Sequence, residues 1–402
     1  MTKETALFLN KHSYEHFDRG GRSLLPTSEL DIHLVTRRRW QGGLDGFADH
    51  PLSHVTLCDG DDENYNRWRD VSTWILRHHP ISRIIAVHER AVLLAAELRS
   101  KFSLPGTDHE TALLFRDKLR MKEAVQRSGA AALPAFSALD SPEDLNRVDW
   151  STGRKVIKSR WGLAAKDVYM ADSLDQARDV VSALDLSNGK FGIEEFIDGP
   201  IFHCDSVVVN GEIRFVSVGK YLVNPSAYSP GGVFGTLLVD DAELVPRIHR
   251  MNAAVLSALG LKDGTAHLEL FRTPADELVF CEVASRPPGG AIPHIIEWQY
   301  GFNIVEAQIR IDAGLPVSLG RSTSTGTCGF LSFYPGGGEA RGIPPHRFGA
   351  LDIVEHIEHQ GAGNGLGGVR HSTDFLDSYV VRAPDEKGFV DRMARIEDEY
   401  WQ

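Results

Sequence analysis

The segment HLELFRTPADELVFCEVASRPPGG, from His267 to Gly290, holds two apolar runs on either side of the turn-like sequence PADE. This pattern predicts an antiparallel hairpin. Pairing about the centre of the turn places Glu269 directly opposite Glu282, where Cβ atoms lie about 4.5–5.5 Å apart and like charges destabilise the pair. Two such carboxylates suit Mg²⁺, which takes its remaining ligands from phosphates and water. The alternative is a solvated hairpin with two exposed glutamates.

Basic residues are also expected near the paired carboxylates. Arg286, four residues beyond Glu282, shares its strand parity, and the glycines Gly289 and Gly290 follow in a turn whose backbone N–H groups can approach an anion. Lys118 and Lys158 are each typical of a surface lysine when taken alone. Together with a metal hairpin they indicate phosphoryl transfer, which relies on cations around the phosphate oxygens. The residues therefore predict a metal-dependent, phosphate-handling site between two units.

Composition limits the classes of partner. The chain has 402 residues, enough for two or three units at about 150 residues each. Its 43 basic and 55 acidic side chains give a net charge of −12, so we expect no nucleic-acid partner. The four cysteines are far apart and form no CxxC pair, which indicates reduced, buried thiols. The sequence shows neither a signal-like segment nor a run of ~20 apolar residues, so we expect a cytoplasmic protein without a membrane partner.

The first part of the chain alternates short apolar runs with helical patterns, which is typical of a parallel sheet covered by helices. Strands are expected at 6–9, 32–35, 54–58 and 83–87, and helices at 64–77 and 89–102. This predicts a Rossmann-like unit, although the early glycine cluster lacks the GxGxxG spacing. A small α+β unit follows, and its insertion in a larger one suggests a lid. After a helix at 115–128, its elements are expected as a strand at 155–158, a loop at 159–166, a helix at 173–184 and a strand at 191–196.

Antiparallel hairpins dominate the rest. Asn210 and Gly211 form a strong two-residue hairpin signal between strands at 206–209 and 212–218. Further elements are expected as a helix at 303–313, strands at 329–333, 352–357 and 377–383, and a helix at 385–400.

These motifs, in this order, resemble the ATP-grasp superfamily. The matching elements are Asp117 and Lys118, Lys158 with its small-residue loop, EEFIDG, HLE, and EVASR followed by PPGG. The last group looks most like the branch of L-amino acid ligases that make dipeptides. The resemblance implies an α/β and α+β fold with a Rossmann-like N-terminal domain, an inserted lid and an antiparallel-sheet C-terminal part. The implied bounds are 1–112 for the N-terminal domain, 113–198 for the first ATP-grasp part with its lid at about 131–198, 199–315 for the second part with the metal hairpin, and 316–402 for a C-terminal subdomain.

The resemblance also implies roles for individual residues. Lys118 and Lys158 would contact the ATP phosphates, and Glu269 and Glu282 would hold Mg²⁺. Arg286 would stabilise the acyl phosphate and the tetrahedral intermediate, beside the substrate turn of Gly289 and Gly290. The remaining ATP contacts would come from Ala164 and Ala165 in the loop, Glu194, Glu195, Phe196 and Ile197 in the adenine-binding hinge, and His203 at the ribose.

The implied activity is ATP-dependent carboxylate–amine ligation through an acyl phosphate, with release of ADP and phosphate and formation of a dipeptide or amino-acid amide. The partners would be a small carboxylate and an amine, and the protein would be a homodimer. The alternatives are an ATP-grasp carboxylase that activates bicarbonate and a non-catalytic ATP-binding regulator. Ala164 and Ala165 replace the common Gly and Ser, and Ala284 replaces a common metal-binding Asn. The metal number is therefore open between one and two, with Mn²⁺ as a substitute.

Three other motifs favour ordinary structural roles. The sequence GNGLGG at 363–368 satisfies GxGxxG, but the short polar segment after it predicts a glycine-rich hairpin rather than a nucleotide loop. His356 and His359 are expected on a polar surface strand rather than in a zinc site. His267 is expected to be a hydrogen-bonded core histidine rather than a general base.

Overall fold

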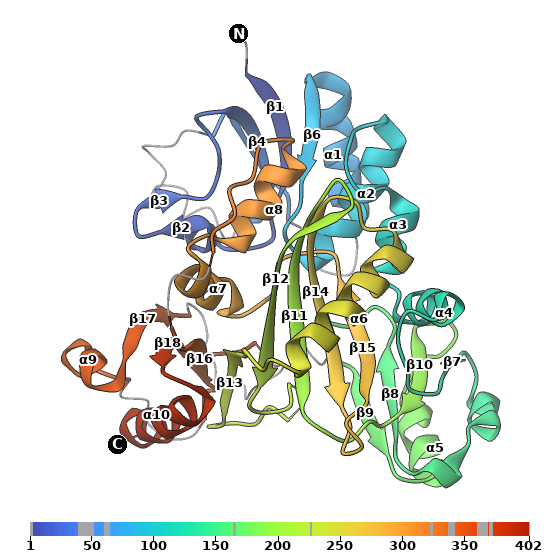
Figure 1. Cartoon of the computed structure of the whole chain (residues 1–402). Helices are drawn as coiled ribbons and strands as arrows, with labels where there is room; N and C mark the ends of the chain where they lie inside the picture. Colours follow the sequence, from blue (N-terminus) through green and yellow to red (C-terminus); the bar gives the residue numbers. More distant parts are fainter. Residues whose placement is uncertain are drawn as a thin grey trace.

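The computed structural model describes residues 3–38, 52–59, 65–163, 166–225, 227–321, 325–336, 342–359, 369 and 373–401. These residues form a four-stranded parallel sheet, a four-stranded antiparallel sheet, an eight-stranded antiparallel sheet and a two-stranded ribbon (Figure 1). The glycine-rich segment 363–368 lies outside the described residues. The mixed α/β and α+β class predicted from the sequence is confirmed.

The N-terminal sheet has the strand order β5-β4-β1-β6, with all strands parallel. Its apolar runs are buried on both faces, as strands covered by helices require. The elements of this part are β1 (Glu4–Leu9), η1 (Tyr14–Phe17), β2 (Asp18–Arg19), β3 (Arg22–Ser23), β4 (Leu30–Thr36), β5 (His54–Leu57), α1 (Asn66–His78), β6 (Ile81–Ile85) and α2 (Glu89–Phe102). The four strands and two helices predicted here are confirmed, apart from shifts at their ends.

The helix predicted at 115–128 is wrong at its start. The chain instead forms α3 (His109–Leu114), a break, and α4 (Lys118–Ser128). Asp117 has extended backbone angles, and its side chain accepts hydrogen bonds from the N–H groups of Leu119 and Arg120. Such a cap begins a new helix, so Lys118 stands in the first turn of α4 rather than inside a longer helix.

The inserted unit is a four-stranded antiparallel sheet in the order β7-β10-β8-β9. It consists of β7 (Phe136–Leu139), η3 (Pro142–Arg147), η4 (Trp150–Thr152), β8 (Lys155–Ser159), β9 (Val168–Ala171), α5 (Leu174–Ser182) and β10 (Phe191–Glu195). β7 and β9 are not among the predicted strands. Each has only four residues and a single buried position, too little for a period of two to show.

The eight-stranded sheet has the order β15-β14-β11-β12-β13-β16-β18-β17. The strands are β11 (Ile201–Val209), β12 (Glu212–Tyr221), β13 (Val233–Leu238), β14 (Gly264–Arg272), β15 (Leu278–Ala284), β16 (Thr327–Phe333), β17 (Ile353–Glu358) and β18 (Asp377–Ala383). Asn210 and Gly211 both have positive φ, as the predicted hairpin turn requires. Because β13 pairs with β16, the boundary expected between 315 and 316 does not separate two sheets.

Helices cover both faces of this sheet. α6 (Leu244–Leu259) packs with α4 on one face, whereas α7 (Ile292–Tyr300) and α8 (Ile304–Asp312) pack on the other. α8 also reaches the core of the parallel sheet through Val305 and Ile309, so it joins the two sheets. At the C-terminal end lie η5 (Pro345–Arg347), α9 (Phe348–Leu351) and α10 (Glu386–Tyr400). Among the described helices, none is long and apolar enough to cross a membrane.

Candidate active site

The hairpin of β14 and β15 brings the two predicted carboxylates together. Glu269 and Glu282 are register partners, which confirms the opposition predicted from the turn. A shift follows between Glu269 and Leu270, so the rest of the hairpin runs one residue out of that register. Both side chains are partly exposed, at 21% for Glu269 and 32% for Glu282, so a ligand can reach them. Oxygen donors from two carboxylates fit Mg²⁺ or Mn²⁺.

Two lysines face the second carboxylate. The Nζ atom of Lys118 lies 3.4 Å from Oε2 of Glu282, and that of Lys158 lies 3.9 Å from the same oxygen. Lys118 also donates a hydrogen bond to the carbonyl of Gly162 at 2.9 Å. Two cations and one anion therefore lie close together, although they come from α4, β8 and β15. The structure places Lys118, Lys158 and Glu282 in one cluster, while Ala164 and Ala165 lie outside the described residues.

Glu194 forms the centre of a buried ion cluster. Its carboxylate accepts from Lys158 at 2.6 Å and from Lys122 at 3.1 Å, and Lys122 also donates to the carbonyl of Cys281 at 2.7 Å. Burial acts to raise the pKa of Glu194, but the two lysines outweigh it and lower that pKa to about 2. The sequence analysis missed Lys122, whose side chain is fully buried although it lies one turn beyond Lys118.

In the predicted adenine-binding hinge, Glu194 to Ile197, two backbone N–H groups already have hydrogen-bond partners in the protein. The N–H of Glu195 donates to the carbonyl of Ala135, and the N–H of Phe196 donates to that of Arg154. These two groups are therefore not available to read a base. The side chain of Glu194 faces the lysines, and within the described residues no hydrogen bond is found for the N–H of Ile197, so the adenine contact stays a prediction at that position.

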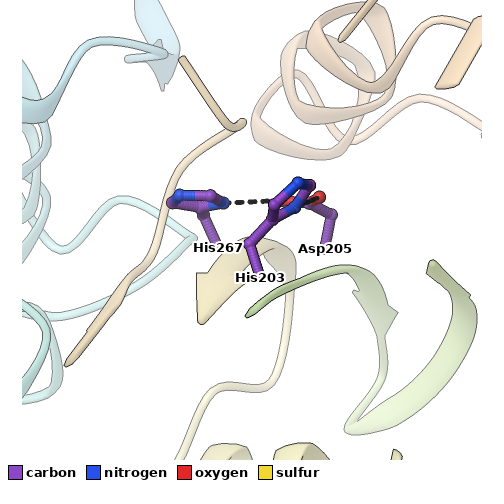
Figure 2. Close-up of side chains that lie close together, drawn as sticks. All are labelled: His203, Asp205 and His267. Atoms are coloured by element: carbon purple, nitrogen blue, oxygen red, sulfur yellow. Dashed lines mark hydrogen bonds and ion pairs between the residues drawn. The ribbon is translucent and has the colours of Figure 1, made fainter. Parts of the chain in front are cut away.

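Glu269 is held from behind by a buried polar cluster. Its Oε1 atom accepts from the hydroxyl of Tyr221 at 2.8 Å and lies 3.4 Å from Nε2 of His267. Figure 2 shows His267 beside Asp205 and His203 in the same cluster. The prediction that His267 is a hydrogen-bonded core histidine agrees with this arrangement. The ribose contact expected of His203 does not fit, because its side chain is fully buried and both ring nitrogens have protein partners.

Arg286 is fixed by the N-terminal domain. Its guanidinium pairs with Glu89, and Glu89 also pairs with Arg116. Burial acts to lower the pKa of Arg286, yet that pKa is raised, chiefly by Glu89 and further by Glu269. The two arginines in turn hold the pKa of Glu89 far below its ordinary value, against the effect of burial. Glu89 was missed although it follows β6 at the carboxyl edge of the parallel sheet, where α/β proteins place ligands.

A group of histidines lies on the N-terminal side of Arg286. His12 stacks on His16 with ring centroids 4.2 Å apart and contacts His88 at 4.7 Å. Burial lowers the pKa of His12, and the charge of Arg286 lowers it further. Burial likewise lowers the pKa of His16 to about 4, so these rings are neutral at physiological pH. The sequence gives no signal that joins the group, because His12 and His16 lie in one segment around η1 whereas His88 precedes α2, more than seventy residues later.

The remaining predicted positions are more open. Gly289 and Gly290 are exposed in the loop that leads into α7, and Gly290 has a positive φ of 58°. His356 lies on β17 and bonds to Asp377 at 2.6 Å, whereas His359 bonds to Ser378 at 2.7 Å. The predicted strand is confirmed for His356, whereas His359 lies one residue beyond its end and is half-buried, and the two histidines have different partners.

No family model matches the chain. Over 311 residues it is 29% identical to an L-arginine-specific L-amino acid ligase from Bacillus subtilis, covering 75% of this chain and 74% of that protein. The crystal structure of an L-amino acid ligase from Bacillus licheniformis superposes with a TM-score of 0.75 at 18% identity, over 99% of this chain and 98% of the other. The chain has the ATP-grasp fold.

A second structure shows how widely this ATP-grasp fold is shared. The biotin carboxylase domain of a 2-oxoglutarate carboxylase from Hydrogenobacter thermophilus, crystallised with MgADP and bicarbonate, matches with a TM-score of 0.72. Its identity is 14%, over 99% of this chain and 90% of that chain. At this identity the likeness concerns the fold alone.

Proposed function

We propose that the protein is an ATP-dependent carboxylate–amine ligase that forms a dipeptide or amino-acid amide. One observation carries this proposal: Glu269 and Glu282 face each other, two lysines lie within 4 Å of Glu282, and Arg286 is close enough to Glu269 for their charges to interact. The similarity to an L-amino acid ligase from Bacillus subtilis supports the same class of reaction.

In the first step, a substrate carboxylate oxygen attacks the γ-phosphorus of ATP, and ADP leaves. Lys118 and Lys158 supply positive charge for the phosphate oxygens, which they can do by shifting from Glu282 and Glu194. Glu269 and Glu282 would hold Mg²⁺, which when bound neutralises charge on the phosphates. Ile197 and its neighbours would hold the adenine.

In the second step, the amine nitrogen attacks the carbonyl carbon of the acyl phosphate, phosphate leaves and the nitrogen loses a proton. Arg286 stabilises the negative charge that develops on the carbonyl oxygen. Its pairing with Glu89 and its hydrogen bond to the carbonyl of Pro287 at 2.7 Å keep it in one orientation. The substrate turn of Gly289 and Gly290 lies beside it in the sequence.

Three finer expectations belong to this proposal. Mn²⁺ would replace Mg²⁺ at the two carboxylates, since both ions accept oxygen ligands. The protein would work in the cytoplasm, and as a homodimer. Activity with MnCl₂ in place of MgCl₂ and the mass measured by light scattering test the first and the last of these.

The central test is a phosphate-release screen of amino-acid pairs with ATP and Mg²⁺, coupled to product mass. At least one pair should release phosphate and give a product lighter by one water than the two substrates together. Glu282→Ala should abolish this reaction, whereas Glu277→Gln, an exposed residue in the turn of the same hairpin, should leave it unchanged.

Other outcomes contradict the proposal. ADP release that follows bicarbonate without any amino acid would favour a carboxylase. Tight ATP binding without turnover across the panel would favour a non-catalytic regulator. Full ADP formation by Glu282→Ala with every active pair would show that the site is placed wrongly.

A further inference from the structure

Asp205 connects two histidines behind the proposed metal site. It lies on β11 with no exposed surface, and its two oxygens accept from Nδ1 of His203 and Nδ1 of His267, each at 2.7 Å (Figure 2). A buried carboxylate is costly unless it is paired and hydrogen-bonded. Here both oxygens are used, so the aspartate and the two rings form a fixed unit.

The hydrogen bonds around His203 define its orientation. The hydroxyl of Thr236 donates to the carbonyl of Lys220 at 2.8 Å, so its oxygen is the acceptor for Nε2 of His203 at 2.9 Å. Nδ1 of His203 donates to Asp205. Both ring nitrogens of His203 therefore face an oxygen of a buried neighbour, so the ring has one fixed orientation.

The sheet is shaped to accept this ring. Gly219 is the register partner of His203 on β12, and a Cβ atom there would come within 2.1 Å of the imidazole. Any other residue at position 219 would displace His203 and with it Asp205. The glycine therefore makes room for the buried histidine at this place.

His267 lies between Asp205 and Glu269 and contacts both carboxylates. Nδ1 of His267 donates to Asp205, and Nε2 on the other side of the ring faces Glu269 and Tyr221. Nε2 lies 3.4 Å from Oε1 of Glu269 and 3.4 Å from the hydroxyl of Tyr221. The hydroxyl of Tyr221 donates to Oε1 of Glu269 at 2.8 Å. Within the described residues, no hydrogen bond is found to Oε2 of Glu269, which leaves that oxygen for a ligand.

We propose that Asp205 is a positioning residue, which holds His267 so that Glu269 keeps one oxygen fixed and presents the other to the divalent cation. This inference rests on the proposed function, in which Glu269 is a metal ligand. Groups that orient metal ligands in this way typically contribute 10- to 100-fold to metal affinity or activity.

The same three residues do not suit a transition metal. His203, Asp205 and His267 offer ligand atoms within 4.8 Å of one another. However, the 2.7 Å separations are hydrogen-bond distances with a proton between the atoms, and a metal would have to displace both protons.

The test measures cation binding separately from turnover. Mn²⁺ is titrated into the full-length protein with ADP and followed by electron paramagnetic resonance, and the Mg²⁺ concentration for half-maximal ADP release is measured in parallel. Asp205→Asn and His267→Gln should each weaken both by about tenfold or more. Ser206→Ala removes a buried hydrogen bond to Asn252 next to Asp205 and should change both by less than twofold.

Each outcome decides the question. Unchanged Mn²⁺ affinity in folded Asp205→Asn overturns the inference, and His267→Gln decides it if Asp205→Asn does not fold. One equivalent of zinc in tag-free protein, lost in Asp205→Asn, would also overturn it. If the wild-type protein binds Mn²⁺ with ADP and both variants weaken binding, but no substrate pair reacts, the inference holds and the proposed function fails.

Discussion

Two carboxylates at opposite ends of the site are each buried between two cations, but the cations differ. Glu194, on β10 of the inserted sheet, lies between Lys122 and Lys158 at the lysine end, whereas Glu89, at the start of α2, lies between Arg116 and Arg286 at the arginine end. An ammonium is a point charge on a flexible stem, while a guanidinium is a planar fork held by directional bonds. We infer that at the lysine end an ammonium group can turn from Glu194 to an incoming phosphate. At the arginine end, Glu89 keeps the guanidinium of Arg286 fixed.

The largest expected effect is at the arginine end. Glu89→Gln removes the buried carboxylate that Arg116 and Arg286 share, and we expect the free energy of unfolding to fall by about 3–5 kcal/mol. Urea denaturation measures this. Glu97→Gln is the matched control on the same helix, because its pair with Arg69 is about one-third exposed and should contribute less than about 1 kcal/mol. Equal losses in the two variants would contradict the comparison.

Next is Arg286 itself. Arg286→Ala should lower kcat by about 10²- to 10³-fold, as is typical when one stabiliser of a developing oxyanion is removed. Arg286→Lys should recover little, because an ammonium cannot reproduce the fork that meets Glu89. Arg250→Ala, an exposed arginine on α6, should leave kcat unchanged. Steady-state phosphate release measures all three, and near-complete activity in Arg286→Lys would show that only charge is needed.

At the lysine end, we expect the contribution of Glu194 to the free energy of unfolding to depend on pH. The pKa of Glu194 is lowered from 4.5 to about 2, so its contribution is full above pH 4.5 and is lost as pH falls through 4.5 toward 2. The shift corresponds to roughly 3 kcal/mol. Urea unfolding between pH 2 and 7 should show the wild-type advantage over Glu194→Gln shrinking across this window. Parallel profiles for the two proteins would refute the prediction.

The smallest effect tests whether a lysine can be exchanged. Lys158→Arg keeps the charge near Glu194 and Glu282, and we expect the KM for ATP to rise by less than about tenfold, or 1.4 kcal/mol. Lys158→Ala should raise it further. If Lys158→Arg raises the KM for ATP as much as Lys158→Ala does, the lysine end depends on geometry as strictly as the arginine end, and the contrast between the two ends is wrong.

Local sequence determined the most about the strands and the paired carboxylates. The turn between β14 and β15 makes these strands an antiparallel pair, but the residues next to the turn pair about position 275, and the shift between Glu269 and Leu270 is what brings Glu269 opposite Glu282. Asn210 and Gly211 define the β11–β12 turn, since both adopt positive φ. The start of α4 was missed because Asp117 acts as a cap, which competes with a continuous helical pattern.

The tertiary structure decided which partners complete the site. Glu89 lies 197 residues from Arg286, and Lys122 reaches the carbonyl of Cys281 over 159 residues. The tertiary structure also places His203 in the buried cluster with Asp205, rather than at the ribose of ATP where it was predicted. Side-chain alternation and turn chemistry act over a few residues, so they specify faces and registers. Contacts between distant elements depend on how the sheets and helices pack, which no local pattern contains.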